Sequence, residues 1–451
     1  MVVHFSFRLP TARSWLRGSA AQQRILMGRQ LMIYHLQNRR AAVLAITAAL
    51  LALPATLAGC ASSGAHGSQT GACSTNVPGV TATSVKLGFI YPDTGPAALV
   101  DVFKGARAGA TARIDEQNDR GGVNGRRIEL AWSDDHSNPD AFLLATHHLV
   151  DSEKVFGLVI TSVVMDKAAG WLAQENVPIT GTATSAIWSK YPNLFHFGNL
   201  YNSGDTSVFG DFVKARGGTK AVIVVDQNQE VTLDLASHFV PSLQSRGITV
   251  VASVSYTAGI TSPDSVAERI KELGADTIIG LAQTEPFIDV YAASKRSGVK
   301  LNVALNTSGI SPELLARRGG EMAGMSVMST IAPPGSAARN AYQEAMTTYT
   351  PEAVDPTEEL AIGGYVAADD MLLGLKLAGA CPTRQTFIDS LREVDNYSAD
   401  GLIAPVDHTR PKQPTLCEGF ITVNQAGTGL APVPPPASLA RDGYWCGSAL
   451  N

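Results

Sequence analysis

Val85-Lys86-Leu87-Gly88-Phe89-Ile90 and Val155-Phe156-Gly157-Leu158-Val159-Ile160 are the short apolar runs from which the fold of this chain can be deduced. Similar runs follow at 221–225, 250–254, 277–281 and 325–328. Continuous apolarity rich in β-branched residues indicates strands that are covered on both faces, as in parallel sheets. Helical patterns lie between the runs, at 102–118, 139–152, 167–175, 233–245, 263–273 and 285–297. This alternation predicts an α/β protein with doubly wound parallel sheets.

The alternation of strand and helix occurs twice, at about 84–197 and again at about 205–328. Turn residues separate the two runs, and the segment Ala332-Pro333-Pro334-Gly335 ends the second one. Three further helical patterns and two strand-like pieces follow, at 337–348, 358–377, 383–394, 401–406 and 417–423. We therefore predict two similar lobes with a cleft between them.

The N-terminal region has the features of an export leader that ends at a cysteine. Arg39 and Arg40 precede an apolar run at 41–57, and Leu57-Ala58-Gly59-Cys60 closes it. This arrangement resembles a bacterial lipoprotein signal, in which the cysteine receives a diacylglyceryl group and becomes the mature N-terminus. The alternative is a transmembrane anchor, but the run contains Pro54 and is shorter than the ~20 residues that a spanning helix needs.

The leader divides the N-terminal part of the chain into two segments. Residues 1–59 form the leader with its signal peptide, and Met32 gives a more compact start than Met1. Residues 60–83 are rich in Ser, Gly, Ala and Thr and predict a flexible tether. We expect an extracytoplasmic protein that is anchored to the cell membrane through its lipid alone.

The charge of the mature chain excludes two classes of partner. The sequence has 35 Lys and Arg, of which seven Arg lie in 1–59, so that 28 remain against 40 Asp and Glu. The resulting net charge of −12 argues against nucleic acid and against anionic lipid headgroups as partners.

The cysteine count agrees with export. Lipidation of Cys60 would leave an even set of four cysteines, which predicts two disulfides outside the cytosol: Cys73, Cys381, Cys417 and Cys446. Three pairings are possible, and we favour Cys381–Cys417 together with Cys73–Cys446. The chain has no C-x-x-C spacing, so we expect no metal site.

An ordered set of short motifs carries a family resemblance. The motifs are Thr94-Gly95-Pro96, Gly121-Gly122-Val123-Asn124-Gly125-Arg126, Asp134-Asp135, Asn138-Pro139 and Glu175-Asn176-Val177-Pro178-Ile179. In this order they resemble the leucine-type (branched-chain amino acid) substrate-binding proteins of ABC transporters, which have the type I periplasmic-binding-protein fold. The resemblance spans about 84–423. The glycine-rich motif follows a helix and predicts a tight return to a strand, whereas a phosphate loop follows a strand and begins a helix.

The resemblance implies two lobes joined by three chain crossings, which we place near Asn199, Pro333 and Asp400. Lobe 1 would then consist of 84–199 and 334–400, and lobe 2 of 200–333 and 401–451. Lobe 1 would hold a ligand carboxylate with hydroxyl and main-chain N–H groups after its third and fourth strands. The matching positions are Ser162, Ala183 and Ser185. Alternatively, the two serines cap helices.

Lobe 2 departs from the family pattern at the positions that the resemblance identifies. Two aromatic positions are occupied by Glu230 and Gln283, and the acid that pairs with an α-ammonium is replaced by Thr307. Tyr365 retains the family's aromatic residue, although packing on a helix face is an alternative role for it. A cleft this polar predicts a small polar solute, an amino acid or a related compound, and weak binding of leucine, isoleucine and valine.

The expected function is capture of a small molecule for an ABC permease and its ATPase by hinge closure. We expect no enzymatic activity and no cofactor, because the sequence lacks G-x-S-x-G, H-E-x-x-H and Walker motifs. An enzyme nevertheless remains a further hypothesis, because an α/β fold alone does not exclude catalysis. The main alternative is a receptor or sensor subunit with the same fold that is not coupled to transport.

Overall fold

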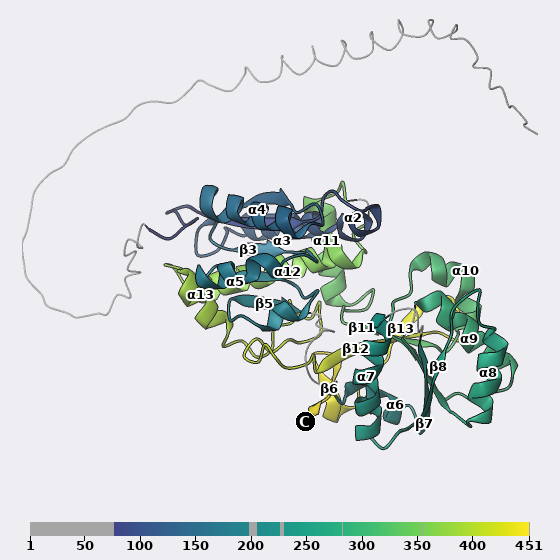
Figure 1. The fold of residues 1–451 in the computed structure, drawn as a ribbon. Helices are drawn as coiled ribbons and strands as arrows, with labels where there is room; N and C mark the ends of the chain where they lie inside the picture. Colours follow the sequence, from purple (N-terminus) through teal and green to yellow (C-terminus); the bar gives the residue numbers. More distant parts are fainter. Residues whose placement is uncertain (1–75, 198–204, 226–229, 282, 354, 451) are drawn as a thin grey trace, which may run out of the picture. The chain divides into compact units, whose positions relative to one another are not determined.

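Two β-sheets, each with helices on both faces, form the folded part of the chain in this computed structural model (Figure 1). The structure describes residues 76–197, 205–225, 230–281, 283–353 and 355–450. Both sheets contain the parallel strands that the sequence predicts, so the expected α/β class is confirmed.

The first sheet has five strands, all parallel to their neighbours. Their order is β2 (Arg127–Asp134), β1 (Ser84–Tyr91), β3 (Leu158–Ile160), β4 (Ile179–Thr182) and β5 (Leu194–Phe197). Because all five run in one direction, their carboxyl ends meet at a single edge of the sheet.

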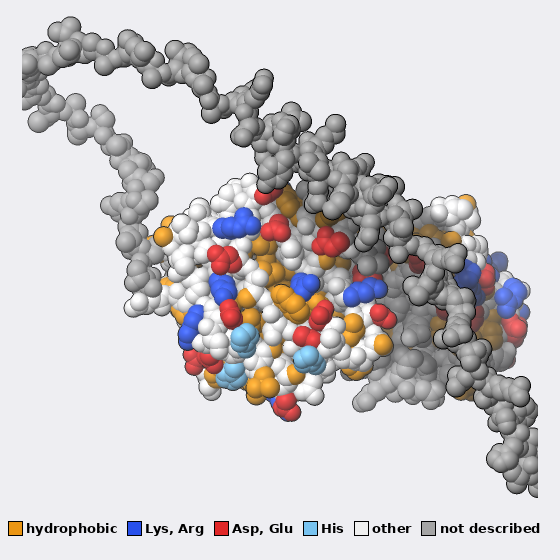
Figure 2. Space-filling view, turned by 90° about the horizontal axis from the view of Figure 1, so that it is seen from above, with side chains coloured by type: hydrophobic (Ala, Val, Ile, Leu, Met, Phe, Trp, Pro, Cys, Tyr) orange, Lys and Arg blue, Asp and Glu red, His pale blue; other side chains and the backbone are white. Residues whose placement is uncertain are grey.

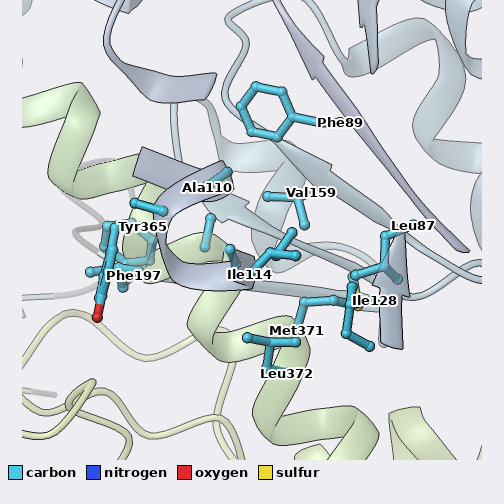
Figure 3. Close-up of a cluster of buried hydrophobic side chains, with 14 of the residues drawn as sticks. Leu87, Phe89, Ala110, Ile114, Ile128, Val159, Phe197, Tyr365, Met371 and Leu372 are labelled. Atoms are coloured by element: carbon cyan, nitrogen blue, oxygen red, sulfur yellow. The ribbon is translucent and has the colours of Figure 1, made fainter. Parts of the chain in front are cut away.

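Alternate side chains of β1 enter two different cores. Leu87 and Phe89 pack toward α3 (Ala106–Asp119), α11 (Ala337–Tyr349), α12 (Glu359–Leu377) and α13 (Arg384–Leu391) (Figure 3). Ile90 packs toward α4 (Pro139–His147) and α5 (Asp166–Gln174). Burial on both faces explains why these strands are apolar without alternation.

Glycines allow α3 and α12 to pack closely. A Cβ atom on Gly109 would lie 1.8 Å from the Ala361 carbonyl oxygen, and one on Gly364 would lie 1.9 Å from the Ala106 carbonyl oxygen. This contact fixes helix α12, which comes late in the sequence, against a helix of the first α/β run.

The second sheet has a parallel part and an antiparallel part. The parallel strands are β7 (Lys220–Val225), β8 (Thr249–Ser255), β9 (Thr277–Gly280), β10 (Val303–Asn306) and β11 (Ser326–Ser329). The antiparallel strands are β12 (Cys417–Val423), β13 (Leu430–Pro432), β14 (Ala440–Arg441) and β15 (Tyr444–Cys446). A separate ladder joins β6 (Asp205–Thr206) to β16 (Ala449–Leu450).

Helices also cover both faces of the second sheet. One face carries α6 (Val208–Ala215) and α7 (Glu230–Ser245), and the other carries α8 (Pro263–Glu272), α9 (Thr284–Arg296) and α10 (Pro312–Met322). Short helical segments elsewhere are α2 (Ala97–Phe103), η1 (His148–Ser152), η2 (Ala186–Ser189) and η3 (Ala437–Leu439).

Several local predictions are confirmed and others are wrong. Gly121, Gly122 and Gly125 all have positive φ, between 72° and 94°, as the tight return requires. The helix expected over 102–118 is interrupted, since α2 ends at Phe103 and α3 begins at Ala106. The strand expected at 401–406 is absent from the described residues, where only the isolated bridges of Ile403 and Val406 occur.

The favoured disulfide pairing is wrong. Cys417 is bonded to Cys446, because β12 and β15 place these two residues directly opposite each other in an antiparallel ladder. The pairings Cys381–Cys417 and Cys73–Cys446 are thereby excluded. Cys381 is disulfide-bonded as well, to a partner outside the described residues.

The predicted lobe boundaries and crossings stay predictions. The crossing near Asn199 and the segment containing Cys60 and Cys73 lie outside the described residues, whereas Pro333 and Asp400 lie within them.

On the face that Figure 2 presents, acidic and basic side chains are interspersed.

Candidate functional site

Three of the predicted ligand-binding residues follow strands of the first sheet at its carboxyl edge. Ser162 follows β3, and Ala183 and Ser185 follow β4. The Thr184 hydroxyl donates a hydrogen bond of 2.8 Å to the Ser162 carbonyl oxygen, so that the two loops are joined. The Ala183 N–H lies 3.5 Å from the Phe197 carbonyl oxygen, next to the end of β5. The structure therefore brings Ser162, Ala183 and Ser185 together at one edge.

Neither serine caps a helix through its side chain. The buried Ser162 hydroxyl accepts a bond of 3.2 Å from the Val164 N–H. Ser185 is the residue before η2 but makes no side-chain capping bond, and its hydroxyl donates to Asp166 at 3.0 Å. The alternative that Ser162 and Ser185 cap helices is therefore wrong for their side chains.

Two aspartates that follow β2 give the same edge its electrostatic character. Burial raises the pKa of Asp135, and bonds from Ser162 and the Ser137 N–H lower it only in part. Burial also raises the pKa of Asp134, but donors that include the Thr94 hydroxyl and the His136 N–H together hold it below its ordinary value.

Buried polar atoms without partners concentrate at this edge. The Asp135 Oδ2, Ser137 Oγ, Thr161 Oγ1 and Thr182 Oγ1 atoms are buried and have no hydrogen-bond partner. Buried polar groups in native proteins are normally satisfied, so such a concentration is typical of a place that receives water or a ligand. None of these four positions was predicted from the sequence as a site residue, although Asp135 belongs to one of the family motifs. Their shared signal is their place at or just after a strand end.

The second sheet provides a polar carboxyl edge of its own. The exposed residue Gln283 precedes α9. Thr307 follows β10, and its N–H donates 3.0 Å to the Gly280 carbonyl oxygen at the end of β9. Asn306 donates from Nδ2 to the Thr284 hydroxyl at 3.2 Å, whereas its buried Oδ1 atom has no partner.

Glu285, an acid close to Gln283 in the sequence, already has a cationic partner. It is exposed and forms an ion pair with Arg317. The side chain of Glu230 lies outside the described residues.

Tyr365 lies on α12 in the hydrophobic core that packs against the first sheet (Figure 3). Its hydroxyl donates a bond of 2.8 Å to Glu116 on α3, and its ring meets Tyr342 edge-on at 5.1 Å between centroids. Burial and the bond to Glu116 raise the pKa of this tyrosine. These contacts agree with the alternative role of Tyr365, which is packing on a helix face.

Within the described residues, no group of three or more His, Cys, Asp or Glu side chains is arranged to hold a metal ion. No helix among them is long and apolar enough to span a bilayer.

Known proteins share this architecture and sequence pattern. The sequence model of a family described as periplasmic binding protein matches residues 84–428. The chain belongs to the periplasmic binding protein family. Its curated relatives are binding proteins rather than enzymes, in agreement with the non-enzymatic role that the sequence predicts.

Curated periplasmic binding proteins resemble the chain at low identity. A Leu/Ile/Val-binding protein homologue of Brucella melitensis is 24% identical over 66% of this chain and 80% of its own length. The Leu/Ile/Val-binding protein BraC3 of Rhizobium johnstonii is 24% identical over 68% of this chain and 83% of its own length.

Solved structures of the family share the fold. A putative branched-chain amino acid ABC transporter protein from Rhodospirillum rubrum gives a TM-score of 0.66 at 20% identity and covers 78% of this chain and all of its own. A Streptococcus pneumoniae substrate-binding protein in complex with isoleucine gives a TM-score of 0.55 at 18% identity and covers 78% of this chain and 99% of its own. A fatty acid ABC transporter substrate-binding protein from Thermomonospora curvata gives a TM-score of 0.55 at 19% identity and covers 80% of this chain and 93% of its own.

Proposed function

We propose that this protein is a lipid-anchored, extracytoplasmic solute-binding protein of an ABC importer that captures a small polar organic solute by hinge closure. The observation that carries the proposal is the pair of polar strand-end edges. One contains Ser162, Ala183 and Ser185, and the other contains Gln283 and Thr307. Ligands of open α/β sheets bind outside the carboxyl ends of the strands.

The chemistry of the two edges supports a polar ligand. Hydroxyl and main-chain N–H groups of lobe 1 suit a carboxylate. Asn306 and Thr307 in lobe 2 offer neutral hydrogen bonds where a bound α-ammonium would need an acid, because an unpaired buried charge is costly. Similar folds occur in a substrate-binding protein solved in complex with isoleucine and in one named for fatty acid, so the fold by itself does not determine the ligand.

Native mass spectrometry of the protein purified with its endogenous solute would identify the ligand. Calorimetric titration with leucine, isoleucine and valine then tests the class. We expect weak or no binding of all three, and tight binding of any one would contradict the proposed polar specificity. Uptake of the identified solute should require the cognate permease and ATPase. Uptake that is unchanged without them would favour the sensor alternative.

A further inference from the structure

A cavity of about 260 Å³ lies beside the segment 405–417, at the end of strand β5. Its lining includes His196, Arg392, His408, Arg410 and Arg441, together with two acids, Asp395 and Asp407. This lining differs from the residues that we assign to the solute site.

Arg392 provides a cation that has no ion-pair partner among the described residues. Its guanidinium donates to three carbonyl oxygens: Pro192 at 2.9 Å, His408 at 2.8 Å and Leu194. Among the residues that the structure describes, no carboxylate lies within ion-pair distance of it. A guanidinium has five N–H donors, so two remain after these three bonds.

The environment of Arg392 makes the missing counter-charge costly. The guanidinium lies 4.1 Å from the Phe195 ring centroid, which compensates only in part. Burial lowers the pKa of Arg392 to about 10, and attraction to the carboxylate of Asp370 opposes this shift only in part. An anion in the cavity would relieve this cost, because buried charges are normally paired.

His196 provides the complementary group. It is 6% exposed, and its Nδ1 atom is buried without a hydrogen-bond partner. Burial, with His408 and Arg392 nearby, lowers the pKa of His196 to about 3, so the ring is neutral at physiological pH. Its ring also donates to the Pro411 carbonyl, which leaves Nδ1 as an acceptor that needs a donor.

His408 and the two acids of the cavity already have partners or are exposed to solvent. His408 bonds the buried Asp370 at 3.1 Å, and Asp407 accepts from the Thr409 N–H at 2.9 Å. Asp395 is exposed. Arg410 and Arg441 are exposed, and the guanidinium of Arg410 has only a distant contact of 3.8 Å to Asp407.

We infer that this cavity is a second binding site, for a small oxyanion that retains a hydroxyl proton. The anionic oxygens would accept from Arg392 and Arg410, and the hydroxyl would donate to His196 Nδ1. Inorganic phosphate at pH 7 has both features, whereas sulfate is matched in size and charge but has no hydroxyl proton. A site built to pair with a hydroxyl rejects the analogue that lacks it.

Calorimetry with phosphate and with sulfate tests the proposal, using the full mature chain. We expect phosphate to bind at least tenfold more tightly than sulfate. Arg410→Gln should weaken phosphate binding about tenfold, since one charge-assisted bond is lost. The control Arg269→Gln removes an exposed arginine of α8 and should leave phosphate affinity unchanged. Absent phosphate binding, equal affinity for sulfate, or an unchanged Arg410→Gln variant would each overturn the inference.

A second measurement locates the anion without a variant that could misfold. In protein labelled with ¹⁵N-histidine, phosphate should shift the Nδ1 resonance of His196, because this lone pair gains a donor. Heat of binding without a change at His196 would place phosphate elsewhere and would overturn the inference. The arginine and histidine results do not depend on which solute fills the proposed cleft.

Discussion

Glu418 on β12 is a buried carboxyl group whose Oε2 atom has no hydrogen-bond partner. It is 2% exposed, and burial raises its pKa from 4.5 to about 8. The fold therefore favours the neutral acid. The associated stability is fully present below pH 4.5 and is lost as the pH rises through 8.

Replacing Glu418 should remove this pH dependence. We expect Glu418→Gln to match the unmodified protein at pH 4 and to exceed it at pH 9 by roughly a few kcal/mol, since each pKa unit corresponds to ~1.4 kcal/mol. Urea unfolding at a series of pH values measures the difference. Glu268→Gln, an exposed glutamate of α8, is the control. Parallel stability curves for Glu418→Gln and the unmodified protein would contradict the prediction.

Ser162 and Thr307 should contribute unequally to solute binding. If a carboxylate is the anchor, Ser162→Ala should weaken the endogenous solute about tenfold or more, because a bond to a charged group is lost. Thr307→Ala should cost about fivefold, as for a neutral bond. Calorimetry with the solute identified by mass spectrometry checks both, with the exposed Thr348→Ala as control. A larger loss at Thr307 would rule out carboxylate anchoring at Ser162.

At the scale of elements, the Cys417–Cys446 bond joins β12 to β15 across 29 residues. A loop of this length predicts about 3 to 4 kcal/mol of stabilisation through the unfolded state. We expect Cys446→Ser to lower the free energy of unfolding by that order in urea denaturation. A variant as stable as the parent would show that sheet pairing alone holds the two strands.

The second disulfide can be assigned by elimination. Cys381 is disulfide-bonded, and Cys417 and Cys446 pair with each other. The two other cysteines of the sequence are Cys60 and Cys73. Because we assign Cys60 to lipidation, we predict Cys73–Cys381. Peptide mapping without reduction should yield that cross-link, and a free thiol at Cys73 would refute it.

At the scale of the whole molecule, anchoring should depend on Cys60. Each buried CH₂ of an acyl chain contributes about 0.8 kcal/mol, so stable anchoring takes more than one chain. Cys60→Ala should release the protein from the membrane fraction or leave its leader uncut, whereas Ser62→Ala should not. Membrane-bound Cys60→Ala protein with the parent's mature mass would contradict lipidation.

Solute binding should also make the particle more compact. Several crossings between two lobes suit a hinge that closes on a ligand. Small-angle scattering with saturating solute should show a smaller radius of gyration than without it, and Ser162→Ala at the same solute concentration should show a smaller change. An unchanged radius in the saturated parent would count against closure.

The sequence by itself determined the α/β class and the approximate extents of most strands and helices. It also determined the glycine-rich turn after the first long helix and the polar loops at the strand ends, because both follow from local chemistry. Runs such as 85–90 report burial on both faces, and Gly121, Gly122 and Gly125 report a backbone conformation, so each is readable locally. The loops of Ser162 and Ser185 were placed correctly at a strand-end edge because parallel strands share one edge.

Only the tertiary structure decided which distant residues meet. Cys417 faces Cys446 because of antiparallel register, and no local pattern encodes that pairing. Tyr365 meets Glu116 because close glycine contacts fix α12 on α3, some 250 residues apart in sequence. The unmatched charge of Arg392 and the lone pair of His196 likewise became visible only once the chain was folded, since desolvation and hydrogen-bond partners are properties of the packed molecule.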